Sequence, residues 1–385
     1  MNRLLESLRR PATALIGVVF LVSGMFKLLD PTGTALIVSE YFKFLHLNFL
    51  VGFSRAFGFA LSLAESMTGA ALIAGVWRKW AILLAGLMTA FFTVITAVLL
   101  IVNPEMDCGC FGQMVHLTHL QSFLKNVVLM LLWALAAFPL RALGEPRASK
   151  YVSFSVVAAA IVCFAICSSR SLPIVDKTDL VAGVELSASD DDAPLLSIRD
   201  FDGNYCEDIL QDGPVMVISV YDPAGASGSA PKGTGNAEAG TVPAGAGSRD
   251  EHSRSAGAGS RGVAGDMARF NTASALQLIA QCEQLGIAPV VLCTGDSTVP
   301  GIPDDYLFFA DRRSLLSLNR SNAGATYLYD GQIVSKWMAR DYPAADRLEA
   351  LMDEDPIELI DSEMRHGHLV FQSVLLALFA VLLFV

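Results

Sequence analysis

Two cysteines separated by one glycine are the residues of this 385-residue chain best suited to chemistry. Cys108 and Cys110 lie in Asp107-Cys108-Gly109-Cys110-Phe111-Gly112, which we call the CGC turn, between two long apolar runs. Two thiols at this spacing can close a small disulfide or offer two thiolates to a metal ion, and glycine permits the tight backbone that either needs. A loop this short stabilises a fold little through entropy, which favours a redox-active pair over a static structural bridge.

Two histidines follow the turn closely enough to join a metal site. His116 and His119 complete the spacing Cys-x-Cys-x5-His-x2-His, which offers four ligands suited to tetrahedral zinc or to copper. Histidines at the start of a membrane helix are also interfacial residues, and that is the commoner role. Metal binding therefore stays an alternative to the redox pair.

A carboxylate in the middle of an apolar run is the next candidate. Glu65 lies within Leu61-Ser62-Leu63-Ala64-Glu65-Ser66-Met67, where an ionised side chain is costly unless it is paired or protonated. Its candidate partners are Lys27 and Arg55. Such a pair can serve the function of the protein or fix the register of two helices, and the sequence does not separate the two roles.

The composition indicates an integral membrane protein, because 53% of the residues are hydrophobic and only 17% are charged. Residues 1–168 and 368–385 carry 12 Lys and Arg against 7 Asp and Glu, whereas residues 169–367 carry 15 against 31. No basic stripe is present to neutralise phosphates, so nucleic acid is not an expected partner. The lipid bilayer is the expected partner of so apolar a chain.

Apolar runs predict six membrane-spanning helices. Four of them form an all-α four-helix bundle over residues 1–140, at about residues 12–29, 53–76, 80–102 and 120–138. A fifth, at about 152–167, lies in residues 141–170, and a sixth, at 369–385, lies in residues 368–385. No small-residue cleavage site follows the first run, so we expect it to be retained. Residues 32–52 are amphipathic, and they form either an interfacial helix or an extramembrane packing segment.

Positive charges predict the orientation of these helices. They fall on one side, which should be cytoplasmic together with the N-terminus: Arg3, Arg9, Arg10, Arg78, Lys79, Arg141, Arg147 and Lys150. The CGC turn and the acidic part of the chain then share the extracytoplasmic side of a bacterial inner membrane. That side is oxidising, so disulfide chemistry can occur there.

Residues 171–367 predict a soluble α/β domain flanked by the fifth and sixth spans. Strands are expected at 215–221, 289–293 and 306–310 and a hairpin at 326–337, with helices at 267–285, 314–319 and 344–352. The Gly-, Ala- and Ser-rich stretch 223–265 predicts a flexible insertion. The remaining cysteines, Cys163, Cys167, Cys206, Cys282 and Cys293, are expected as packing residues or unpaired thiols, although Cys163 and Cys167 lie one helical turn apart and could form a thiol relay.

Three features of the membrane part together resemble a known family. They are the run Phe20-Leu21-Val22-Ser23-Gly24 followed by Lys27, Leu28, Asp30 and Pro31; Glu65; and the CGC turn. Over roughly residues 10–140 these resemble DoxX-like membrane proteins, specifically the MauE (methylamine utilisation) branch. The resemblance implies a role in forming or transporting disulfides during maturation of periplasmic methylamine dehydrogenase. It also implies an envelope thiol protein as partner, a quinone as candidate cofactor, and membership of a thiol–disulfide or quinone-linked oxidoreductase system.

The soluble domain is similar to a thioredoxin-like domain that lacks its cysteine pair. Thioredoxins place Cys-x-x-Cys at the head of a helix, where the dipole lowers a thiol pKa, and a cis-proline opposite it. The corresponding stretches are Tyr221-Asp222-Pro223-Ala224-Gly225 and Ala323-Gly324-Ala325. This domain is therefore expected to dock, sense or cover rather than to exchange thiols. A non-enzymatic membrane scaffold or assembly factor, in which the CGC turn is structural, is the alternative function.

Overall fold

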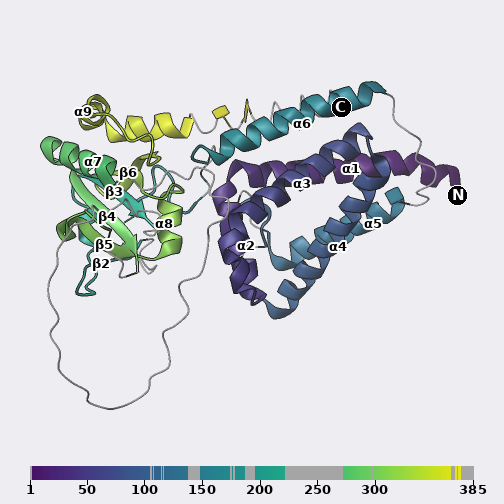
Figure 1. The fold of residues 1–385 in the computed structure, drawn as a ribbon, viewed down its shortest axis with the longest axis horizontal. Coiled ribbons are helices and arrows are strands. Elements are labelled where there is room, and N and C mark those ends of the chain that lie inside the picture. The colour runs from purple at the N-terminus through teal and green to yellow at the C-terminus, as the bar shows by residue number, and fades with distance from the viewer. Residues whose placement is uncertain are drawn as a thin grey trace, which may run out of the picture.

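The computed structural model consists of a helical bundle and an α/β domain that lie end to end (Figure 1). The structure describes residues 2–365 except 105, 107, 114, 116, 138–147, 174–175, 177, 187–195, 222–271 and 296–298, and beyond them 369–370 and 372–373. The insertion predicted at 223–265 and almost all of the sixth span predicted at 369–385 lie outside the described residues.

Five helices in the described part of the chain are long and apolar enough to cross a membrane, which confirms a multi-pass membrane protein. They are α1 (Asn2–Leu29), α3 (Ser54–Ala74), α4 (Arg78–Val102), α5 (His119–Ala137) and α6 (Ala148–Ser169). Apart from the long N-terminal extension of α1, their ends fall within four residues of the predicted ends. Hydropathy alone locates these helices because lipid tolerates few charged side chains.

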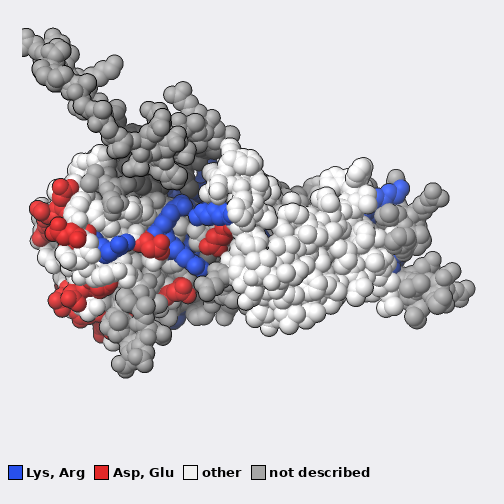
Figure 2. Space-filling model, turned by 90° about the horizontal axis from the view of Figure 1, so that it is seen from below, with Lys and Arg blue, Asp and Glu red and all other residues white. Residues whose placement is uncertain are grey.

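An uncharged belt surrounds the bundle on the face seen in Figure 2. Acidic side chains gather over the α/β domain, whereas Lys and Arg reappear at the far end of the bundle. A belt of this kind suits contact with lipid. Which side of the membrane each end occupies stays a prediction.

Helices α1 and α3 approach closely because small residues lie at their contact. A Cβ atom added to Gly69 would lie 2.4 Å from the backbone nitrogen of Leu21, and one added to Gly24 would lie 2.3 Å from Ser66 Oγ. This close approach sets the distance between the side chains that α1 and α3 direct at each other further along.

Gly69→Ala should therefore destabilise the bundle by about 1–3 kcal/mol, because the two backbones must move apart. The measurement is the melting temperature of the detergent-solubilised protein. Gly52→Ala is the matched control, since a Cβ at that position meets nothing within 4 Å. Equal melting temperatures for the two variants would show that the close approach contributes nothing to stability.

Helix α2 (Pro31–Phe44) covers the end of the bundle that faces the α/β domain (Figure 1). Asp30 begins it, because its Oδ1 accepts a hydrogen bond from the Gly33 backbone nitrogen at 2.8 Å. Eight of the 14 residues of α2 are buried. Of the two alternatives for this segment, the structure supports the packing element over a helix lying free in the interface.

The α/β domain contains one mixed six-stranded sheet, in the order β2-β5-β4-β3-β6-β7. Strands β3 (Pro214–Val220), β4 (Ala288–Thr294) and β5 (Leu307–Ala310) run parallel, whereas β2 (Ile198–Arg199), β6 (Gly324–Tyr329) and β7 (Gln332–Trp337) run antiparallel to their neighbours. The predicted α/β domain is thus present, and the short edge strand β2 is an addition to it.

Two cores cover the two faces of this sheet, which explains why six of the seven residues of β3 are buried. Met216 and Ile218 pack with α7 (Thr272–Leu285) and α9 (Ala345–Asp353) on one face. Val215 and Val217 pack with α8 (Arg312–Leu318) on the other. This alternation follows from the two-residue period of a strand.

The α/β domain contacts the bundle through the loop that precedes β6. Arg320 Nη2 lies 3.2 Å from Asp30 Oδ2, and both side chains are less than one-tenth exposed. Burial raises the pKa of Asp30, and the charge of Arg320 acts in the opposite direction. Leu36 of α2 packs against the core cluster on the α8 face of the sheet. Within the bundle, the Ser168 hydroxyl of α6 donates to the Leu28 carbonyl oxygen of α1.

Candidate functional site

The CGC turn lies against α2, and the short strand β1 (Cys110–Gln113) begins within it. Gly109 has a φ of 58°, and a Cβ there would lie 2.4 Å from Ile37 Cγ2, so conformation and space both require glycine. The Tyr41 hydroxyl of α2 donates to the Cys108 carbonyl oxygen at 2.7 Å. Cys108 is buried and Cys110 is half-buried.

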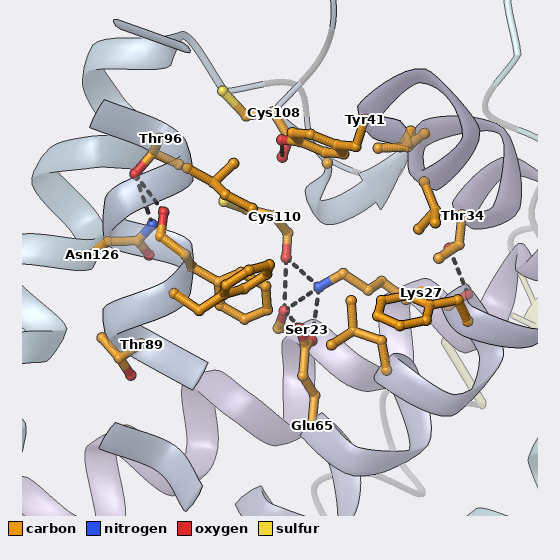
Figure 3. Close-up of a pocket in the computed structure, with 18 of the residues that line it drawn as sticks. Ser23, Lys27, Thr34, Tyr41, Glu65, Thr89, Thr96, Cys108, Cys110 and Asn126 are labelled. Carbon is orange, nitrogen blue, oxygen red and sulfur yellow. Dashed lines mark hydrogen bonds and ion pairs between the residues drawn. The ribbon is translucent and has the colours of Figure 1, made fainter. Parts of the chain in front are cut away.

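A buried ion pair holds the second cysteine from below (Figure 3). Lys27 Nζ lies 2.7 Å from Glu65 Oε2 and 2.7 Å from the Cys110 carbonyl oxygen, and 2.9 Å from Ser23 Oγ. Ser23 Oγ in turn lies 2.8 Å from Glu65 Oε2 and 2.7 Å from the same carbonyl oxygen. Three acceptors thus surround an ammonium group with three N–H bonds.

The pairing resolves the choice of partner for Glu65. Lys27 and Glu65 are 5% and 1% exposed, whereas Arg55 donates instead to the Ser169 carbonyl oxygen at 3.4 Å. A buried ion pair depends on further hydrogen bonds. Ser23 Oγ and the Cys110 carbonyl oxygen accept them from Lys27, whereas Glu65 Oε1 has no hydrogen-bond partner among the described residues. The pair therefore joins α1 and α3 and also positions the CGC turn.

The first cysteine contacts a histidine. Cys108 Sγ lies 2.9 Å from His119 Nδ1, and His119 Nε2 lies 3.1 Å from the Pro104 carbonyl oxygen. A carbonyl oxygen only accepts, so we assign the ring proton to Nε2, which leaves Nδ1 of the neutral ring as an acceptor facing the thiol. A thiol, a base and a group that orients the base together form the arrangement that activates a nucleophile.

A cavity of about 320 Å³ adjoins both cysteines, and helices α1 to α5 form its walls with the CGC turn. Its lining is mainly apolar and aromatic. Among the lining residues, Leu45, Phe57 and Phe91 are 44%, 51% and 53% exposed, so the cavity opens on a surface that faces lipid. The site can therefore be reached by an apolar molecule from the bilayer.

The histidines predicted as metal ligands are not brought together by the described structure. His116 lies outside the described residues, and His119 contacts Cys108 alone of the three other proposed ligands. Within the described residues no group of three or more His, Cys, Asp or Glu side chains could hold a metal ion. The four-ligand set of Cys108, Cys110, His116 and His119 stays a prediction.

The other cysteines lie apart from this site. Cys163 and Cys167 are exposed on α6, where they line an apolar groove, and no described contact links them to the CGC turn. Cys206 is half-buried beside a turn. Cys282 and Cys293 are buried in the α/β core, and burial raises the pKa of each thiol to about 12.

These two core thiols should resist labelling in the folded protein. A pKa of about 12 leaves roughly one thiol in ten thousand ionised at pH 8, and the thiolate is the species that reacts. Mass spectrometry after iodoacetamide treatment at pH 8 should find Cys206 modified while Cys282 and Cys293 stay unmodified until denaturant is added. Modification of all three at similar rates would contradict the buried placement.

Three functional contacts escaped the sequence analysis. Ser23 lies one helical turn before Lys27, so their common face was available as a signal. The sequence around Tyr41 carries no such signal, because the role of Tyr41 depends on where α2 packs. His119 was identified as a ligand candidate, but its contact with Cys108 depends on the path of the chain between them.

Residues 4–139 match the model of the family described as methylamine utilisation protein MauE. No curated protein and no solved structure matches the chain.

Proposed function

Residues 4–139 form a membrane domain of the methylamine-utilisation-associated MauE family, and from that premise we propose that Cys108 and Cys110 are a redox pair serving extracytoplasmic thiols. The pair would carry disulfides or electrons between the membrane and thiols of envelope proteins. The observation that carries the proposal is the 2.9 Å contact between Cys108 Sγ and His119 Nδ1, with Cys110 two residues away beside the same cavity.

The oxidised pair would transfer its disulfide to a client protein in two steps. A client thiolate attacks one sulfur, which forms a mixed disulfide and releases the other cysteine as a thiolate. A second client thiolate then breaks the mixed disulfide, so the client gains one S–S bond. The CGC pair gains two electrons and, with two protons, becomes the dithiol. His119 supports the exchange by giving a proton to the Cys108 sulfur when it leaves and taking it when that sulfur attacks.

The α/β domain would serve this centre without exchanging thiols itself. We propose a thioredoxin-like identity for it, supported by the central order β4-β3-β6-β7 and by the loop before β6 lying at the end of β3. There the Tyr221 backbone nitrogen donates to Asn322 Oδ1 at 3.0 Å, and the Ala323 nitrogen donates to the Ser219 carbonyl oxygen at 2.7 Å. The same loop carries Arg320, so the edge that would hold a thioredoxin's cysteines is turned toward the bundle.

Mass-shift alkylation of the purified protein tests the redox pair. We expect the Cys108/Cys110 mass shift to appear after a mild reductant and to vanish after a disulfide donor, with Cys108→Ala and Cys110→Ala identifying the two thiols. A disulfide that physiological redox partners leave intact would overturn the proposal in favour of a scaffold. Elemental analysis of the same sample tests metal handling.

The proposed orientation has a separate test on intact cells. A membrane-impermeant maleimide should label Cys206 in the α/β domain without lysis, and it should not label a cysteine introduced in place of Lys79 at the opposite end of the bundle. The reverse pattern would place the redox pair on the cytoplasmic side.

A further inference from the structure

The family resemblance implies a quinone but no residues that would hold it, and the lining of the cavity beside the redox pair fits such a group. We propose that the cavity binds a lipophilic two-electron, two-proton acceptor of the quinone class, with the carbonyl-bearing ring beside the cysteines and the apolar chain toward the lipid. The redox step of this proposal rests on the proposed function, whereas the binding site does not.

The walls of the cavity suit an apolar ligand of this size. Its volume of about 320 Å³ falls at the lower end of the range for small-molecule sites. Helices α1 to α5 supply mostly aliphatic and aromatic side chains to it, and exposed Phe57 and Phe91 mark its opening. An apolar rim of this kind suits a ligand that enters from the bilayer better than one that enters from water.

Two polar groups in the lining are available to a ligand. Glu65 is 1% exposed, and although its Oε2 binds Lys27, its Oε1 is buried with no hydrogen-bond partner in the described part of the chain. An orphaned buried acceptor is costly, and a ligand hydroxyl would satisfy it. Lys125 lies with Nζ 4.7 Å from the centroid of the Phe111 ring and has no carboxylate partner among the described residues. Its ammonium group can donate to a carbonyl oxygen.

A quinone matches this pair of groups in both of its redox states. The oxidised ring carries carbonyl oxygens that accept from Lys125, and the reduced ring carries hydroxyls that donate to Glu65 Oε1. A fatty acyl chain would fill the apolar part but leave both groups unused. The requirement for an acceptor and a donor in one lining thus favours a redox ring over a lipid tail.

The reaction balances with this acceptor. Oxidation of the pair breaks two S–H bonds, forms the Cys108–Cys110 bond and releases two electrons and two protons. A bound quinone would supply the acceptor for both electrons and both protons, and the hydroquinone would be the product. His119 Nδ1 receives the proton of Cys108 before it passes to the ring oxygen.

Binding is tested first without the thiols. Decyl-ubiquinone should raise the melting temperature of the full chain carrying Cys108→Ser and Cys110→Ser, and decylbenzene, which shares the chain but lacks the carbonyls, should raise it much less. Lys125→Met should weaken quinone binding about tenfold or more. Equal shifts with both compounds would show an apolar cavity that does not recognise the ring, and would overturn the proposal.

A tryptophan that fills the cavity and a tryptophan placed just outside it form a matched pair of variants. Ile95 of α4 lines the cavity, whereas its neighbour Val94 does not line it and is 63% exposed. Ile95→Trp should abolish the quinone-dependent shift, and Val94→Trp should leave it intact. An unchanged shift in Ile95→Trp would place the quinone elsewhere.

The redox step is tested last, on pre-reduced protein freed of reductant in the absence of oxygen. One equivalent of decyl-ubiquinone should be reduced for each Cys108–Cys110 disulfide formed. Quinone binding together with cysteines that neither quinone nor a disulfide donor oxidises would overturn the proposed function and leave the site in place. Oxidation by disulfide donors with no quinone binding would do the opposite.

Discussion

His119→Ala is expected to slow alkylation of Cys108 at pH 7 by about 10²-fold, which is within the usual contribution of a general base. The imidazole Nδ1 lies 2.9 Å from the sulfur and takes its proton, and only the thiolate attacks. The rate is measured by mass spectrometry with a small haloacetamide in a Cys110→Ala background, so that one thiol of the site reports. With rising pH, hydroxide ionises the thiol without help, and the two rates should converge.

His46→Asn is the control for this experiment. His46 is exposed at the end of α2 and has a φ of 59°, a conformation that asparagine adopts readily. This variant should keep the wild-type rate at every pH. A His119→Ala rate equal to wild type at pH 7 would show that the histidine only packs against the sulfur.

Lys27→Met is expected to destabilise the bundle by about 3–5 kcal/mol, because it leaves the Glu65 carboxylate buried without its cation. The Cys110 carbonyl oxygen loses a donor at the same time, and of its two donors in the described part of the chain Ser23 is the one left. The melting temperature in detergent should fall sharply. The yield of folded protein from membranes should fall with it.

The double variant Lys27→Met/Glu65→Met separates structure from function. It removes both charges, so its stability should recover a large part of the loss. If the pair only fixes helix register, the double variant will also oxidise and reduce its cysteines at the wild-type rate. We expect a folded protein that has lost quinone binding, because Glu65 Oε1 is gone, and whose cysteines oxidise more slowly, because Lys27 no longer positions Cys110.

The sequence located the membrane helices well because lipid imposes a simple rule on composition. It also limited the partner of Glu65 to Lys27 or Arg55, since few charges occur in the apolar runs. The choice between them needed the close packing of α1 on α3, which depends on Gly69 and Gly24. Small residues in a membrane helix predict a close helix contact, but they do not identify the helix that makes it.

The candidate site was predictable only in part. The spacing of Cys108 and Cys110 made them candidates, but their environment comes from segments far apart in the chain. Tyr41 and Pro104 act through a hydroxyl and a backbone carbonyl, for which residue type gives no warning. Strand β2 was missed because two residues cannot show a period. The α/β strands that were predicted are longer and more apolar.

Helix α2 lies between the two parts of the protein and contacts both. One face reaches the CGC turn through Ile37 and Tyr41, the other packs Leu36 into the α/β core, and Asp30 at its start binds Arg320. A shift of α2 therefore changes the surroundings of the cysteines and of the α/β domain in the same event. Thermodynamic reciprocity then applies: a protein that binds the α/β domain and displaces α2 alters the reduction potential of the cysteines, and the redox state of the cysteines alters the affinity for that protein equally.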